Sequence, residues 1–304
     1  MKYIKILLFI LAISNQIFAQ QDAQFSQYMY NTIVVNPAYA GSRQVLSFNG
    51  VHRSQWTGVE NAPTTQTISL HSPVSREVGM GLSVVNDRIG PSAETSAAID
   101  FSYTIPVDDF DTKFSFGLKG GIHSLDVDFS KLNIYDPNDI PFQQNITNRF
   151  SPVIGFGGYL HSEKWYLGLS IPNIIKTDYY DEVAVSTASQ RITLYSIAGY
   201  VFDLNYRLKF KPAVLLKMVS GSPLAADLSL NFLFDDKFTL GASYRMDAAI
   251  SALAGFQVSK GLMLGYAYDF DTTEFSRYNS GSHEFFLRYE FFNKENGKVS
   301  PRFF

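Results

Sequence analysis

The sequence predicts an all-β protein: a transmembrane, antiparallel, up-and-down β-barrel of about 14 strands, with an N-terminal segment that is periplasmic or lies in the lumen. Three observations support this prediction. Alternating polar and apolar segments repeat from about residue 45 onward, the connections between them alternate in length, and the clearest apolar faces carry no charged residue. Alternation with a period of two indicates strands, because successive side chains of a strand point to opposite faces.

The alternation is clear in "VGMGLSVV" (78–85), where Val78, Met80 and Leu82 share one face. The same pattern recurs along the chain without a helical stretch of comparable strength. The predicted strands are 45–53, 64–71, 78–86, 95–105, 113–125, 151–162, 164–171, 191–202, 208–219, 225–234, 238–245, 248–258, 261–270 and 282–292. The glycine clusters 79–81 and 155–158 fall inside these strands, and they indicate a bend or a close neighbour.

The connections predict an orientation in the membrane. The short ones include 162–164, 235–237 and 259–261, whereas 54–63, 87–94, 126–150, 172–190 and 271–281 are expected to be long. In outer-membrane barrels the short turns face the periplasm and the long loops face outward. An even number of strands then places both chain ends on the periplasmic side, so we expect the N-terminal segment to begin at that rim and to fill the barrel mouth.

Charged residues of the strands lie on the faces opposite the apolar rows. A charge that faces lipid at mid-depth costs about 2–4 kcal/mol, so these side chains are predicted to face the lumen. They are Lys113, Lys119, Lys209, Lys211, Lys217, Asp227, Arg245, Asp269, Glu284, Arg288 and Glu290. The basic and acidic residues on these faces are nearly equal in number. This favours pairing among them inside the barrel over a charge-selective pore, but an open channel stays an alternative. A secreted β-sandwich would also alternate; the loop lengths and the Tyr and Trp near strand ends favour the barrel.

The first residues predict export to the outer membrane of a Gram-negative cell. Lys2 and Lys5 precede an apolar run at 6–13, and Ala19 marks a plausible cleavage point. The expected organisation is a signal peptide at 1–19, a periplasmic or plug segment at 20–44, the barrel at 45–292 and a periplasmic tail at 293–304. The chain has no cysteine, which excludes disulfides and thiol chemistry, and its net charge of −3 gives no case for nucleic acid.

No motif predicts a catalytic residue, a metal ion or a cofactor. The five histidines are scattered and no pair has metal-ligand spacing. The acidic loop groups at 108–111 and 136–139 do not match a calcium loop, so we interpret them as solvated turns. We therefore predict that the protein is not an enzyme; a Ser or carboxylate beside a His at one rim would favour a barrel hydrolase instead.

Several stretches together resemble the PorP/SprF family of Bacteroidota outer-membrane proteins. They are "QYMYNTIVVNPAYAGS" (27–42), "HRSQWTGVENAPTTQTISLHSP" (52–73), "NDRIGP" (86–91), "SIPNI" (170–174), "EFFLRYEFF" (284–292) and "SPRFF" (300–304). The likeness spans essentially the whole mature chain. Asn61 departs from it, since a Gly often stands there in the family, although Asn also tolerates a left-handed turn.

The resemblance implies a non-enzymatic barrel associated with type IX secretion and gliding motility. Such a barrel binds the C-terminal sorting domain of a large surface adhesin, or connects to the periplasmic secretion components. The alternative is a passive porin or a barrel that transports hydrophobic compounds. Residues expected to form a plug or bind the partner are Phe25, Gln27, Tyr28, Tyr30, Asn36, Pro37, Tyr39, Gly41, His52, Arg53, Gln55 and Trp56.

Overall fold

Antiparallel strands make up most of the described chain. The structure, a computed structural model, describes residues 25–109, 111–131, 145–175, 192–292 and 303. Its strands are β1 (Leu46–Ser54), β2 (Thr64–Pro73), β3 (Val78–Ile89), β4 (Ser92–Pro106), β5 (Lys113–Val127), β6 (Ile146–His161), β7 (Trp165–Ile171), β8 (Thr193–Tyr200), β9 (Phe202–Asn205), β10 (Leu208–Val219), β11 (Ala225–Phe234), β12 (Phe238–Arg245), β13 (Ala249–Gln257), β14 (Leu262–Asp271) and β15 (Ser282–Phe291). Short helical turns are η1 (Tyr28–Tyr30), α2 (Thr32–Val35), η2 (Pro37–Tyr39), η3 (Phe129–Lys131) and η5 (Glu274–Arg277). No helix among the described residues is both long and apolar enough to cross a membrane.

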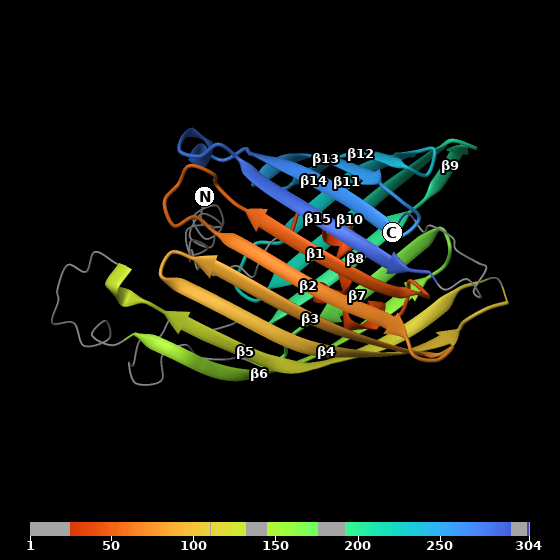
Figure 1. Cartoon of the computed structure of the whole chain (residues 1–304), viewed down its shortest axis with the longest axis horizontal. Coiled ribbons are helices and arrows are strands. Elements are labelled where there is room, and N and C mark those ends of the chain that lie inside the picture. Colours follow the sequence, from red (N-terminus) through yellow and green to blue (C-terminus); the bar gives the residue numbers. More distant parts are fainter. Residues whose placement is uncertain (1–24, 110, 132–144, 176–191, 293–302, 304) are drawn as a thin grey trace, which may run out of the picture.

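The strands close into a barrel (Figure 1). Consecutive strands pair with each other except β8 and β9, and β1 pairs with β15 to complete the ring. Both β8 and β9 pair with β10, so they occupy one position in the wall, and the described part of the chain forms a closed barrel of 14 strands. Closure removes every sheet edge from lipid, which is the condition for strands to span a membrane. The predicted fold class is confirmed.

The two faces of each strand differ as the alternation predicts. On β11, Leu228 and Leu230 are 55% and 51% exposed, whereas Ser229 and Asn231 between them are buried. The outer surface is therefore apolar and suited to hydrocarbon, and the polar side chains face the interior of the barrel.

One predicted connection is wrong. The segment 87–94 is not a long loop, because β3 and β4 pair without interruption from Val78↔Tyr103 to Ile89↔Ser92. The chain reverses at Gly90, whose φ of +55° suits glycine, and Pro91. The polar residues here resemble a loop in sequence, but strand pairing can continue beyond the hydrocarbon, where outward side chains need not be apolar. In the same way β6 begins at Ile146 rather than at 151.

Short turns gather at one end of the barrel, on the right in Figure 1, and β5 and β6 project at the other end. We call these the short-turn end and the long-loop end. β1 starts and β15 finishes at the short-turn end, the side that the sequence predicts to face the periplasm. Of the predicted signal peptide and tail, residues 1–19 and nearly all of 293–304 lie outside the described residues.

Candidate functional site: the N-terminal segment in the lumen

Residues 25–45, here called the plug segment, form a chain of short helical turns rather than a strand. Asn36 caps η2, since its side chain accepts a hydrogen bond from the Ala38 amide at 3.0 Å. Pro37 occupies the first position of η2, where its fixed φ favours a helical start. Gly41, at φ +72°, then turns the chain toward β1. These local signals explain why the segment shows neither helical nor strand periodicity.

The plug segment runs through the barrel from end to end. Ser26 contacts Glu284 and Asp269, which lie near the long-loop ends of β15 and β14. Gly41 lies against Pro73, at the short-turn end of β2. The expectation that the segment begins at the periplasmic rim is therefore wrong for its described part. Phe25 starts at the opposite end of the lumen, because the charged residues that hold the chain there face inward from strands distant in the sequence.

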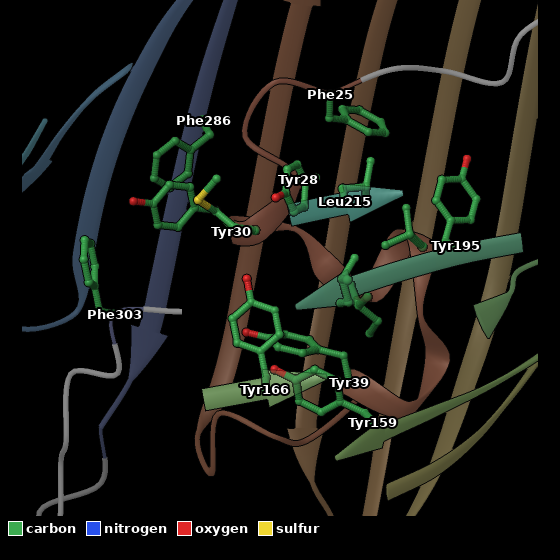
Figure 2. Packing of buried hydrophobic residues seen from close by; sticks show 14 of the residues in the cluster. Phe25, Tyr28, Tyr30, Tyr39, Tyr159, Tyr166, Tyr195, Leu215, Phe286 and Phe303 are labelled. Atoms are coloured by element: carbon green, nitrogen blue, oxygen red, sulfur yellow. The ribbon is translucent and has the colours of Figure 1, made fainter. Parts of the chain in front are cut away.

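Buried aromatic side chains of the plug segment pack against the barrel wall (Figure 2). Tyr30 stacks on Phe286 with ring centroids 4.5 Å apart, and Tyr39 meets Tyr159 edge-to-face at 5.5 Å. The cluster takes its wall residues from eight strands: Val51, Tyr159, Tyr166, Tyr195, Ile197, Leu215, Leu233, Met263 and Phe286. Since these strands surround the lumen, the cluster spans its width.

Both tyrosines of the first helical turn are nearly inaccessible to solvent. Burial raises the pKa of Tyr28 and of Tyr30 above the ordinary tyrosine value. The two hydroxyls therefore stay neutral at physiological pH and add no charge to the lumen.

A charged cluster holds the start of the plug segment at the long-loop end. Glu284, fully buried, accepts hydrogen bonds from the backbone amides of Ser26 and Gln27, both at 2.8 Å. Its carboxylate also pairs with Arg53 at 3.2 Å. Arg53 in turn pairs with Asp269 at 2.6 Å, and the Ser26 hydroxyl donates to Asp269 at 2.5 Å. Charge-assisted bonds of this kind in a buried site are strong and directional.

A second ion pair extends this cluster. Arg245 donates to Asp227 at 2.8 Å and to the carbonyl of Phe25 at 3.1 Å. We call Arg53, Asp227, Arg245, Asp269 and Glu284 the Glu284 cluster. It brings together residues of β1, β11, β12, β14 and β15 around the first described residues of the plug segment.

Toward the short-turn end the plug backbone lies directly against the wall. A Cβ atom at Gly117 would sit 2.1 Å from the Ala38 nitrogen, and one at Gly79 would sit 2.2 Å from the Ala40 carbonyl oxygen. Such distances cannot be accommodated by side-chain movement, so glycine is required at both positions. The close approach predicted at 79–81 thus has its physical reason in the plug segment. In the second cluster a Cβ at Gly157 would meet Asn36 of the plug segment, whereas one at Gly155 would meet the backbone of Pro172.

Hydrogen bonds from the wall pair the polar groups of the plug segment. Ser102 and Ser170 donate to the carbonyls of Ala40 and Val35, both at 2.7 Å. The Asn31 amide donates to Thr67 at 2.8 Å. The segment is thus seated by backbone contact and polar pairing as well as by apolar packing.

A second group of charges lies at the short-turn end. Arg43 pairs with Glu290 at 2.6 Å, and Arg288 lies 3.8 Å from the same carboxylate. Burial lowers the pKa of Arg43, but the adjacent Glu290 outweighs that effect and the pKa is raised overall. Lys211 donates to the carbonyl of Phe303 at 2.6 Å. We call Arg43, Lys211, Arg288 and Glu290 the Lys211 cluster.

The structure places the other predicted site residues apart from these clusters. Lys119 pairs with Asp100 at 2.9 Å in mid-lumen, and the Lys217 ammonium lies 6.0 Å from the Tyr195 ring. Two lysines, Lys113 and Lys209, are half-buried toward the short-turn end, and His52 is exposed on the outer face of β1. Gln55 and Trp56 lie in the loop after β1, where Trp56 meets Phe275 edge-to-face at 5.0 Å.

Sequence reasoning did not identify several residues that make contacts inside the lumen. They are Ser26, Asn31 and Arg43 of the plug segment, and Thr67, Ser102, Ser170 and Phe303 outside it. Small polar residues on an inward strand face give no individual signal, because lumen faces are polar throughout. Phe303 lies 92 residues from Lys211 in the sequence, so only the fold reveals the contact.

One inward-facing group contains a serine, a histidine and a carboxylate. His123 lies 3.1 Å from Glu94 and 3.5 Å from the Ser151 hydroxyl. The three residues come from adjacent strands, with His123 directly opposite Ser151 in the register. Among the described residues no three His, Asp or Glu side chains are placed to hold a metal ion together.

Comparisons with known proteins agree with the barrel. The family model described as type IX secretion system membrane protein PorP/SprF matches residues 17–289. Two similar solved structures are the toluene transporter TbuX of Ralstonia pickettii (TM-score 0.50, 10% identity, covering 84% of this chain and 91% of that one) and the CymD monoaromatic hydrocarbon channel (TM-score 0.50, 12% identity, 91% and 95%). At these identities the likeness shows the fold alone. A comparison with curated sequences finds no match.

Proposed function

Because the chain belongs to the PorP/SprF family of type IX secretion system membrane proteins, we propose that this outer-membrane barrel binds a partner protein rather than acting as a passive pore. The observation that carries the proposal is the plug segment, which fills the width of the lumen and is held by buried charges at its first residues. Conduction requires a continuous polar path, and a lumen filled by the chain itself does not provide one.

The partner is a secreted or surface-anchored protein, such as an adhesin bound through its C-terminal sorting domain, or a periplasmic component of the secretion apparatus. A role in gliding follows if the partner is a motility adhesin. We also propose that residues 1–19 direct export and are removed. A filled barrel still offers two surfaces: the loops at the long-loop end and the mouth at the short-turn end.

The direct test is affinity capture of the tagged full chain from its own membranes in mild detergent, with mass spectrometry of the proteins retained. We expect a large secreted protein or a periplasmic secretion component to be retained, and deletion of the gene to remove a large protein from the cell surface. Absence of any retained protein together with an unchanged surface proteome would refute the proposal.

Transport of small hydrophobic compounds is the alternative function. Its support is the polar, charged inner face of the barrel, together with the fold that the two similar structures share. This function requires the plug segment to leave a path through the lumen. Conductance of the purified chain in a lipid bilayer distinguishes the two functions.

We propose no catalytic role for the Ser151, His123 and Glu94 group. Ser151 is only 6% exposed, and inward polar groups of a barrel satisfy one another in the same geometry. We expect no labelling of the full chain by a fluorophosphonate probe, measured by gel fluorescence. Labelling that disappears in Ser151→Ala would instead indicate a nucleophilic serine.

A further inference from the structure

Lys211 is a fully buried lysine that has no carboxylate partner among the described residues. The structure gives its ammonium one hydrogen-bond acceptor, the carbonyl oxygen of Phe303 at 2.6 Å. Two aromatic rings complete its surroundings, those of Phe303 at 4.6 Å and Tyr30 at 5.3 Å from the ring centroids. Burying an ammonium is unfavourable unless it is paired, and a neutral carbonyl pairs it only in part.

The other charges of the Lys211 cluster increase the imbalance. Among the described residues the cluster holds three cations, Arg43, Lys211 and Arg288, but one carboxylate, Glu290, which contacts the two arginines. Arg288 reaches Glu290 only at 3.8 Å and otherwise contacts the sulfur of Met263 at 3.3 Å and the ring of Tyr30. By contrast, the charges of Lys119 and Asp100 balance each other in mid-lumen. The Glu284 cluster holds three carboxylates with two arginines, so its charge is not positive. Excess positive charge in the described lumen is therefore concentrated at the short-turn end.

Phe303 already occupies this site with a carbonyl oxygen and an aromatic ring. Its carbonyl oxygen accepts from Lys211, and its ring is buried beside Lys211 in the same apolar cluster as Tyr30 (Figure 2). An aromatic ring next to an ammonium gains a cation–π contact, and an oxygen acceptor at the same place completes the recognition of one residue. Lys211 lies near the start of β10, so the site is reached from the short-turn end.

We propose that the Lys211 cluster is a binding site for the C-terminal aromatic residue of a partner polypeptide, which displaces Phe303. The incoming carboxylate takes the place of the Phe303 carbonyl and neutralises the excess charge of Lys211 and Arg288, and its ring takes the place of the Phe303 ring. A carboxylate acceptor adds ionic attraction to the hydrogen bond from the Lys211 ammonium, which the neutral carbonyl of Phe303 does not supply. Capture of a C-terminal carboxylate is also an established mode of peptide recognition. The inference rests on the proposed function, because it names the chemistry of the partner.

The test measures peptide binding to the purified full chain in detergent. The probe is a fluorescein-labelled Gly-Ser-Gly-Ser-Gly-Phe peptide with a free C-terminal carboxylate, compared with its C-terminal amide by fluorescence anisotropy. Phe303→Ala removes the ring that lies beside Lys211, so the chain's own residue competes less for the site. We therefore expect this variant to bind the carboxylate peptide at least about tenfold more tightly than the unchanged chain. We expect the amide to bind at least about tenfold more weakly than the carboxylate.

Matched lysine substitutions in the Phe303→Ala chain identify the site. Lys211→Met should abolish binding, whereas Lys209→Met should not change it, because Lys209 lies on the same strand but pairs with Asp236 at 2.7 Å. Phe303→Leu keeps apolar bulk but loses the aromatic ring. Its affinity for the carboxylate peptide should lie between those of the unchanged chain and of Phe303→Ala. Folding of every variant is checked by far-ultraviolet circular dichroism.

Equal binding of carboxylate and amide, no binding to either Phe303 variant, or unchanged binding after Lys211→Met would each overturn the inference. Two outcomes separate a failure of the Lys211 site from a failure of the proposed function. If the captured partner is retained equally by the unchanged chain and by Lys211→Met, partner binding stands and the Lys211 site does not. If the peptide binds but no protein is captured from membranes, the site stands and the proposed function does not.

Discussion

Replacing Glu284 with alanine is expected to destabilise the barrel by about 3–5 kcal/mol, because it removes one partner of a buried charged network. The change leaves the amides of Ser26 and Gln27 without their acceptor and leaves Arg53 with one carboxylate, Asp269, in place of two. The first residues of the plug segment should then detach from the wall at the long-loop end. Unfolding by denaturant in detergent measures the stability, and bilayer conductance measures the opening of the lumen.

Glu274→Ala is the matched control for this prediction. Glu274 is an exposed acid in η5, in the loop immediately before β15, and its removal should change stability by no more than about 0.5 kcal/mol. If Glu284→Ala proved as stable and as closed as Glu274→Ala, the Glu284 cluster would not hold the plug segment.

Substituting Gly117 by valine is expected to displace the plug segment from its seat. The new Cβ would lie 2.1 Å from the nitrogen and 2.4 Å from the Cα of Ala38, and backbone atoms cannot move aside as a side chain can. Overpacking of this kind costs about 1–3 kcal/mol. The chain has no cysteine, so a single Thr32→Cys substitution, at a buried plug position, reports the displacement by its maleimide labelling rate.

We expect labelling at position 32 to become roughly tenfold to hundredfold faster in Gly117→Val, since local opening is favoured by the energy of the clash. Gly120→Val is the control on the same strand, because a Cβ there meets no atom within 4 Å. Equal protection of the reporter in both variants would show that the plug backbone does not depend on the space at Gly117.

The strands could be predicted from the sequence because their chemistry is local. Alternation along β11 or β15 reflects two environments, lipid and lumen, and each residue reports its own face. The failures have equally physical causes. At 87–94 the pattern disappears because the β3–β4 hairpin continues into water, where the outer face no longer needs apolar residues.

The pairing inside the lumen could not be predicted. Glu284 and Arg53 are recognisable as inward charges, but their contact with Ser26 depends on how the plug segment is threaded. That threading is set by packing against strands spread over most of the chain, as the contacts of Tyr30 with Phe286 and of Tyr39 with Tyr159 illustrate. Aromatic residues in the N-terminal segment indicated burial, but not its direction through the barrel.

We propose that residues 25–45 close the lumen of a barrel that works by binding a protein. Conductance of the unmodified full chain in a planar lipid bilayer tests it most directly. We expect no sustained channel current from the unmodified chain and steady current from Glu284→Ala. A steady, ohmic conductance of the unmodified chain would contradict the claim and would instead support passive transport.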